Sequence, residues 1–339
     1  MPEHYSQTVL SIIGLIFALT TVYFIYTQPI EISEEVDVQT NYQERPVYGA
    51  LQPLPLITQI NQDWVLLGKA LFDSTLLSSD NTVSCSSCHI VSKGGTDNFP
   101  KSVGVNSKLG DRNSPTVLNA SLNFRQFWDG RSITLSEQIS GPIHNPVEMA
   151  SSFPQIIDKL KRAPVFNKAF NALNSNGITK ENIIKAITLY EESLITYNSP
   201  IDNYLLGDDS ALNEQQIRGL DKFKQYGCIT CHQGRNIGGN LFQKLGRLDK
   251  APTHLLEDKG LFNITKLEKD KHVFKVPSLR NVALTAPYFH DGSITTLNDA
   301  VKLMGRMQLG IELSEDDIND IVALLHSFTG EIKEQGTSQ

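Results

Sequence analysis

Cys85-Ser86-Ser87-Cys88-His89 is a C-x-x-C-H run, and the chain repeats the pattern at Cys228-Ile229-Thr230-Cys231-His232. This pattern is the attachment signature of a c-type haem. Both cysteine sulfurs form thioethers with the haem, and the adjacent histidine ligates the iron. The sequence therefore predicts two covalently bound haems, with His89 and His232 as axial ligands.

Three other interpretations of these motifs are a zinc knuckle, a redox dithiol and chance. A zinc site would take its remaining ligands from further cysteines or from a second pair of histidines. A redox dithiol has no need of a histidine after the second cysteine. The two motifs use all four cysteines of the chain, so none is left for a disulfide.

The composition is that of an ordinary globular protein. Hydrophobic residues make up 40% of the 339 positions and charged residues 20%, and the length allows two modest domains. The formal net charge is −7 and there is no basic stripe, which argues against nucleic acid as a partner.

The N-terminus holds an uncharged run of 19 residues, Thr8–Tyr26. As a helix rising ~1.5 Å per residue, this run is just long enough to cross the ~30 Å hydrocarbon core of a bilayer. A cleaved secretory signal would have a shorter apolar region, a positive start and small residues at its end. Here no Lys or Arg precedes the run, and Tyr23 and Tyr26 stand near its end. We predict a membrane anchor at residues 1–27, with a cleaved signal as the alternative.

Residues 28–56 are polar, acidic and contain prolines, so we predict a flexible tether there and a fold that begins near Ile57. Convincing alternating strands are absent, which indicates a mostly α protein with long irregular connections. The apolar spacing predicts helices at Trp64–Phe72, Glu181–Tyr197, Asn213–Tyr226, Leu297–Met304 and Glu315–Phe328.

Three features of the sequence occur twice in the same order. A G-x-x-x-F helix precedes each haem motif, and a proline-containing run and an Asp-Gly turn follow it. The copies are Gly68 with Phe72 and Gly219 with Phe223, then Ser114–Asn119 and Val276–Asn281, then Phe127–Leu135 and Phe289–Leu297. We therefore predict two tandem cytochrome c-type domains, at residues 57–200 and 201–330, followed by a tail at 331–339.

The two copies differ at the sixth ligand position of the iron. Methionine suits electron transfer at this position, and Met304 lies on the helix that follows the second Asp-Gly turn. Met307 is the alternative, although it lies beyond Gly305, where we expect the helix to end. When the copies are aligned, Pro142 matches Met304, and proline has no side-chain ligand for iron.

The first haem is therefore predicted to have an open sixth position, with Gln138, His144 and Glu148 nearby. A carboxylate beside such an iron can move a proton between the two oxygens of a peroxide, so that water leaves as the O–O bond breaks. The simpler interpretation of Glu148 is a surface salt-bridge residue.

From about residue 57 to 330, the sequence closely resembles the bacterial dihaem cytochrome c peroxidases. Beyond the haem motifs, the matching runs are Leu67–Phe72, Arg112–Asn119, Phe127–Arg131, Gly141–Met149, Leu279–Asn281 and Ala286–Gly292. The resemblance implies a high-potential haem, ligated by Met304, that passes electrons to a peroxidatic haem. It implies Trp128 and His290 on the electron path and Glu148 and Gln138 in the peroxide pocket. It also implies a calcium ion held by the Asn113 side chain and by the carbonyls of Thr285 and Pro287.

One position departs from the family pattern. Many members carry a distal histidine that blocks the peroxidatic haem until the other haem is reduced, and the matching residue here is Val105. No histidine occurs between His89 and His144. The first haem is then either permanently open or closed by His144.

The resemblance implies reduction of hydrogen peroxide to water on the periplasmic side of the bacterial inner membrane. The electrons would come from a small cytochrome c, a cupredoxin or a quinol chain, and a homodimer is left open. One alternative is a dihaem oxidase that acts on a protein partner, but that relative closes its second haem with tyrosine rather than methionine. A non-enzymatic dihaem electron carrier is the other alternative.

Overall fold

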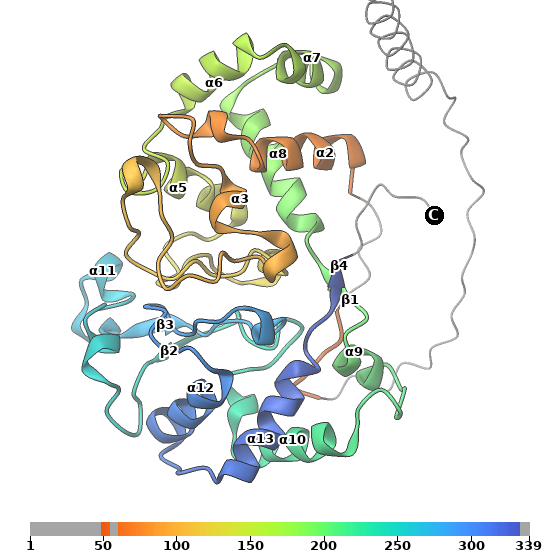
Figure 1. Cartoon of the computed structure of the whole chain (residues 1–339), viewed down its shortest axis with the longest axis vertical. Helices are drawn as coiled ribbons and strands as arrows, with labels where there is room; N and C mark the ends of the chain where they lie inside the picture. The colour runs from red at the N-terminus through yellow and green to blue at the C-terminus, as the bar shows by residue number, and fades with distance from the viewer. Residues whose placement is uncertain (1–48, 55–59, 333–339) are drawn as a thin grey trace, which may run out of the picture. The chain divides into compact units, whose positions relative to one another are not determined.

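A computed structural model of the chain describes residues 49–54 and 60–332 (Figure 1). The predicted anchor Thr8–Tyr26, most of the predicted tether and residues 333–339 of the tail lie outside these described residues. Within them, every helix is too short or too polar to cross a membrane. We call residues 60–200 the first half and residues 201–330 the second half.

The described chain is mostly helical, as predicted. The helices of the first half are α2 (Gln62–Phe72), α3 (Cys85–Cys88), α4 (Leu135–Gln138), α5 (Ser140–His144), α6 (Phe153–Arg162), α7 (Pro164–Leu173) and α8 (Lys180–Ser193). Then come α9 (Pro200–Leu205), α10 (Glu214–Gln225), α11 (Phe262–Thr265), α12 (Leu297–Met304) and α13 (Glu315–His326). Two small antiparallel sheets pair β1 (Thr196–Tyr197) with β4 (Glu331–Ile332) and β2 (Phe242–Lys244) with β3 (Val273–Lys275).

Four of the five predicted helices occur within two residues of their expected bounds, and the fifth was extended too far. We expected a helix to Tyr197, but α8 ends at Ser193 and the chain turns into strand β1. A long-range contact causes this ending, because the Thr196 amide donates to Asn119 Oδ1 at 3.0 Å. Helices α6 and α7 were not predicted; their prolines Pro154 and Pro164 lie in the first turn, where proline is well tolerated.

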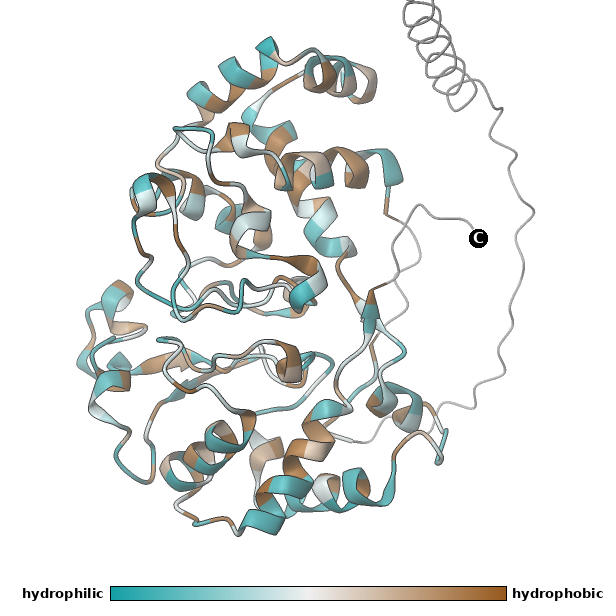
Figure 2. Cartoon of the chain, viewed as in Figure 1, coloured by the Kyte–Doolittle hydropathy of each residue, from teal (hydrophilic) through white to brown (hydrophobic). Residues whose placement is uncertain are grey.

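A pair of crossed helices forms the centre of each half. In the first half α2 crosses α8, and a Cβ atom added at Gly68 would overlap the carbonyl oxygen of Ala186. In the second half α10 crosses α13, and a Cβ at Gly219 would overlap the carbonyl oxygen of Asp320. The two G-x-x-x-F helices therefore need glycine for close backbone contact. Figure 2 shows that these helices carry both apolar and polar positions, as amphipathic core helices do.

The duplication seen in the sequence is present in the backbone. Phe127 and Phe289 both have φ 67°, and Asn119 and Asn281 have φ 58° and 60°. Isolated β-bridges join Gln126 to Ser132 in one copy and Tyr288 to Ile294 in the other. The same sequence spacing, 281 − 119 = 289 − 127 = 162 residues, separates each of these matched pairs. The alignment that matched Pro142 to Met304 is therefore also the structural alignment.

The two halves meet through matched backbone hydrogen bonds. The Asn113 amide donates to the His290 carbonyl at 2.8 Å, and the Lys275 amide donates to the Trp128 carbonyl at 2.9 Å. Asn113 matches Lys275 and Trp128 matches His290, so the contact has approximate two-fold symmetry. Arg112 adds ion pairs to Asp129 of its own half and to Asp258 of the other, both at 2.6 Å.

The predicted start of the fold at Ile57 was too late. Leu51 is 5% exposed and packs in the core of the second half. The Gly234 amide donates to the Ala50 carbonyl at 2.6 Å, and the buried Arg280 guanidinium donates to the Gln52 carbonyl at 3.1 Å. These residues have no helical or strand period, so only their contacts with distant residues could reveal that they are packed.

Candidate active site

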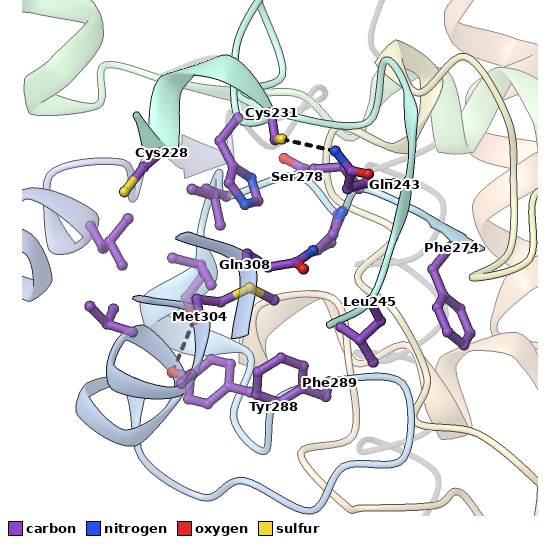
Figure 3. A pocket seen from close by; sticks show the side chains of 18 of the residues that line it. Cys228, Cys231, Gln243, Leu245, Phe274, Ser278, Tyr288, Phe289, Met304 and Gln308 are labelled. Carbon is purple, nitrogen blue, oxygen red and sulfur yellow. Dashed lines mark hydrogen bonds between the residues drawn. The ribbon is translucent and has the colours of Figure 1, made fainter. Parts of the chain in front are cut away.

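The second C-x-x-C-H motif borders a cavity of about 480 Å³ (Figure 3). Cys228, Cys231 and His232 line it from one part of the chain, and Met304 lines it from the end of α12. Figure 3 shows the Met304 side chain extending into the pocket that the two cysteines also border. This is the arrangement expected for a haem attached by thioethers and ligated by histidine and methionine.

The two candidate methionines lie in different surroundings. We expected the helix that carries Met304 to end at Gly305. Instead, a π-helical turn, Gly305–Leu309, continues α12. Met307 is 0% exposed and packs in a small core cluster with Leu255 and Phe274. Met304 is only half-buried and lines the cavity. These positions favour Met304 as the ligand and Met307 as core packing.

Three polar groups of the cavity suit a haem. Burial lowers the pKa of His232 to about 4, which keeps its imidazole neutral, as an iron ligand must be. Lys275 is 7% exposed, and burial lowers the pKa of its ammonium to about 8. His290 Nε2 is buried and has no hydrogen-bond partner among the described residues. Haem propionates would supply the acceptors that Lys275 and His290 need.

The first C-x-x-C-H motif is α3 with His89 as its C-cap. His89 Nδ1 lies 3.3 Å from the Gly95 carbonyl oxygen, which accepts its proton in that tautomer and leaves Nε2 free for a metal. Burial raises the pKa of the Cys85 thiol, and it raises that of Cys88 to about 11. Redox dithiols rely on a lowered pKa, so these thiols suit covalent attachment better.

A structural zinc site finds no support in the described chain. Across residues 49–54 and 60–332, no group of three or more His, Cys, Asp or Glu side chains is placed to hold a metal ion. The two cysteines and the histidine of each motif are therefore not placed together as ligands of one zinc ion.

Glu148 is half-buried close to the first motif, where its charge contributes to the raised pKa of Cys88. Burial raises the pKa of Glu148 itself, while a hydrogen bond from Asn145 Nδ2 to Oε1, at 2.6 Å, and the charge of Arg131 oppose that shift. The net effect is a Glu148 pKa above its usual value. A carboxyl with a raised pKa takes up a proton more readily, which suits a group that accepts and returns a proton.

The loop that carries Val105 packs directly on the Glu148 segment. The Val105 amide donates to the Glu148 carbonyl at 2.8 Å, and the Val105 side chain is 0% exposed. A Cβ at Gly104 would overlap the carbonyl oxygen of Val147. The loop position matched to the family's blocking histidine thus lies beside the proposed peroxide pocket and carries an apolar, fully buried side chain.

The two other candidates near the first motif differ in exposure. Gln138 is half-buried and ends α4, a helix capped by the Thr134 side chain. His144 ends α5, is exposed, and lies edge-on to Phe153 with ring centroids 5.5 Å apart. An exposed ring held against Phe153 favours a surface role for His144 over ligation of iron.

The structure also brings together the residues of the proposed electron path. The rings of Trp128 and His290 meet edge to face with centroids 6.3 Å apart, at the contact between the halves. Trp128 Nε1 donates to the Asn113 carbonyl at 2.9 Å, and His290 stacks on Phe274 at 4.3 Å. Both rings line the cavity of the second motif.

Comparisons with known proteins agree with this geometry. A family model described as di-haem cytochrome c peroxidase matches residues 62–210. The cytochrome c peroxidase Ccp of Escherichia coli is 46% identical over 299 residues, which cover 87% of this chain and 63% of that protein. The cytochrome c551 peroxidase of Pseudomonas aeruginosa is 47% identical over 271 residues, 78% of each chain.

This chain belongs to the dihaem cytochrome c peroxidase family. The resemblance seen in the sequence is thereby confirmed, and with it the prediction of a dihaem peroxidase that binds two haems. A solved structure of a MauG-like protein associated with microbial copper homeostasis is 27% identical, with a TM-score of 0.73. The match covers 86% of this chain and 97% of that one.

Two residues of this peroxidase that act on Glu148 were not predicted from the sequence. Asn145 holds the carboxylate through its side-chain amide, and Arg131 contributes a positive charge. Arg131 is itself fixed by Asp129 at 3.0 Å and stacks on the Phe127 ring at 3.4 Å. Both residues lie inside runs that match the family, but neither run shows which side chains meet.

Proposed function

We propose that this dihaem peroxidase reduces hydrogen peroxide to water at the first haem, with electrons that enter through the second. The observation that carries the proposal is the difference between the matched positions. Met304 lines one haem cavity, whereas Pro142 occupies the same place in the other copy. One iron is then closed by a thioether, and the other is open to substrate beside Glu148.

Glu148 acts as the acid–base group of the reaction. Cys85, Cys88 and His89 would hold a haem, whose iron would supply the redox chemistry of peroxide reduction. Glu148 accepts the proton of the peroxide oxygen nearest the iron and returns it to the distal oxygen, which leaves as water. The whole reaction takes up two electrons and two protons for each peroxide and yields two waters.

Asn145, Arg131 and Gln138 support this proton transfer. The Asn145 amide holds one carboxylate oxygen of Glu148, which leaves the other oxygen for the peroxide. The positive charge of Arg131 stabilises the ionised carboxylate. Gln138 would orient the peroxide through its amide, because it ends the helix that precedes the Pro142 segment.

The second half serves as the electron entry. Met304 would ligate a haem held by Cys228, Cys231 and His232, and a thioether ligand would give that haem the high potential that suits electron transfer. Trp128 and His290 lie where the halves meet and offer an aromatic path between the haems. The predicted domain bounds, 57–200 and 201–330, give each haem its own cytochrome c-type domain. A methionine at this position also favours a peroxidase over the dihaem oxidase that uses tyrosine.

The buried side chain of Val105 supports a first haem that is open in the fully oxidised protein. Valine has no lone pair for iron, and the exposed His144 is held against Phe153. This peroxidase would then need no reductive activation before it binds peroxide.

The calcium site remains part of the proposal. Asn113 Nδ2 donates to the Phe99 carbonyl at 2.9 Å, which turns its amide nitrogen to the protein and leaves its oxygen for a cation. Asn113, Thr285 and Pro287 all border the cavity assigned to the second haem. Asn98 Nδ2 binds the carbonyls of Leu284 and Ala286 and so holds the adjoining segment. We further propose a periplasmic protein, anchored through Thr8–Tyr26, that takes electrons from a small donor protein.

Glu148→Gln tests the proposed function in the purified dihaem protein. The variant keeps the size and the Asn145 hydrogen bond but cannot accept a proton. We expect peroxide turnover to fall by roughly 10²–10⁴-fold while peroxide still binds, since general acid–base catalysis contributes about that much. Glu137→Gln is the control, because Glu137 is exposed in the same half. A loss of only a few-fold in Glu148→Gln, with both haems bound, would reject the assignment.

A further inference from the structure

Glu191 is a buried carboxylic acid that the proposed reaction does not use. It lies near the end of α8, is 6% exposed, and its Oε2 atom has no hydrogen-bond partner among the described residues. Its charge acts on Cys85, one of the two attachment cysteines of the first haem. A buried carboxyl without a partner is costly unless it is neutral or paired, so its position calls for an explanation.

The internal duplication shows what this carboxyl faces. Gly68 meets Ala186 and Tyr190 of α8, and Gly219 meets Asp320 and Leu324 of α13 in the same way. Tyr190 therefore matches Leu324, and Glu191 matches Leu325, the next residue. Leu325 lines the cavity of the second haem. By this match, Glu191 occupies on the wall of the first haem site the place that an apolar side chain occupies on the second.

Few other charges act on this carboxyl. Burial raises its pKa to about 8, and the neighbouring Glu192, which is half-buried, adds to that shift. From the elements packed against α8, α4 contributes Glu137, which is exposed and accepts from the Ile133 amide. Helix α2 contributes the exposed pair Lys69 and Asp73 and the exposed Asp63. Lys185, on α8 itself, lies over the Trp64 ring. Among the described residues, no positively charged side chain contributes to the pKa shift of Glu191. A haem iron at Cys85–His89 would therefore be the positive charge to which it responds.

We propose that Glu191 gains one proton when the first haem is reduced by one electron. This role is separate from the transfer of the peroxide proton by Glu148. The inference rests on the proposed haem at Cys85–His89. The electron comes from the donor by way of the second haem, and the proton comes from water. Reduction removes one positive charge from the site, so the carboxylate is less stabilised and binds a proton more tightly. Oxidation reverses both steps.

The sign of the pH effect follows from this coupling. Between the pKa values of Glu191 in the oxidised and reduced protein, the reduction equilibrium constant of the first haem falls tenfold per pH unit. This equals 59 mV for a one-electron couple. Below this range the carboxyl is neutral in both states, and above it the carboxyl is ionised in both. Leu325 cannot titrate, so the second haem lacks this contribution.

The test is a spectroelectrochemical titration of both haems in the full-length holoprotein from pH 5.5 to 9, on the order of the range in which such a group titrates. Glu191→Gln keeps the shape and removes the charge, and Glu191→Leu copies the second half. In both variants we expect the reduction equilibrium constant of the first haem to be independent of pH over this range. Its value should equal that of the wild-type protein at low pH, where Glu191 is neutral. Glu192→Gln is the matched control, because it removes a half-buried carboxylate one residue along and should retain the tenfold change per pH unit.

An unchanged pH dependence in Glu191→Gln would overturn the inference, as would equal losses in Glu191→Gln and Glu192→Gln. Haem content and peroxide turnover are measured on the same samples. One haem per chain in the wild-type protein would reject the proposed function itself. Two haems with normal sensitivity to Glu148→Gln, but no effect of Glu191→Gln on the potential, would reject only the role of Glu191.

Discussion

The two halves of this peroxidase share a backbone and differ in a few side chains that face the haems. Phe127 and Phe289 adopt the same φ, and Gly68 and Gly219 make the same close helix contact. Yet Pro142 stands where Met304 lines the second cavity. The same duplicated backbone thus carries both haem motifs, while the segments after the Asp-Gly turns differ in sequence and in helical structure.

The helix after the Asp-Gly turn shows how the difference is built. In the second half α12 runs without a break from its cap at Thr296 to Met304 and continues as a π-helical turn. In the first half the matching segment is capped by Thr134 but breaks at Ile139 and resumes as α5, which contains Pro142. The chain then turns and presents Glu148 near the first motif. In the proposed function, the segment that carries the methionine ligand in one copy corresponds to the segment that leads to the acid–base residue in the other.

Met304→His should produce the largest change in the comparison. Histidine keeps the second iron six-coordinate but lowers its potential, by a sizeable part of the roughly 0.8 V range that axial ligands span. Potentiometry and the loss of the sulfur-to-iron absorption band report the change. Met307→Leu is the matched control, because Met307 is buried outside the cavity. If the reduction potential of the second haem fell in Met307→Leu and not in Met304→His, Met307 would be the iron ligand and Met304 the core residue.

The helix crossings should respond alike in both halves. We expect Gly68→Ala and Gly219→Ala each to lower the free energy of unfolding by about 1–3 kcal/mol or more, because the added Cβ overlaps a backbone carbonyl oxygen. Thermal denaturation of the holoprotein measures the loss. Gly110→Ala should have little effect, since its Cβ would approach the Ser102 carbonyl oxygen no closer than 3.6 Å. A large loss in one half alone would show that the crossings are not equivalent.

Asn145→Ala should shift the pH dependence of peroxide turnover, because it acts on Glu148 in the first half. The Asn145 amide stabilises the charged Glu148, so its removal raises the Glu148 pKa further above the usual carboxyl value. Turnover needs the carboxylate, and its acid limb should therefore move to higher pH. A hydrogen bond to a charged group contributes about 1.5–3 kcal/mol, which corresponds to a shift of about one to two pH units. The exposed Asn167→Ala is the control, and a profile that stays in place would remove Asn145 from the pocket.

Features set by nearby residues could be predicted from the sequence. The two C-x-x-C-H motifs, the capped helix that begins at Leu297 and the matched runs of the duplication all depend on short spacings. Met304 and Pro142 could be compared from the amino-acid order alone, because the copies align without gaps between the Asp-Gly turns and these residues.

Features set by distant contacts could not be predicted in this way. Leu51 has no local pattern and is buried only because it packs on the second half. The end of α8 depends on Asn119, far away in the sequence. The burial of Glu191 could have been predicted, since it continues the spacing of Ile183 and Ile187 on the buried face of α8. Its proximity to Cys85 could be seen only in the fold. Asn145 and Arg131 required the fold to show that both act on Glu148.

The central claim is that the first haem is open and the second closed in the fully oxidised protein. An EPR spectrum of the ferric holoprotein, with two haems per chain confirmed, tests it most directly. We expect one high-spin and one low-spin signal, with the high-spin signal changing on addition of peroxide before any reductant is supplied. Two low-spin signals that do not respond to peroxide until an electron is added would contradict it.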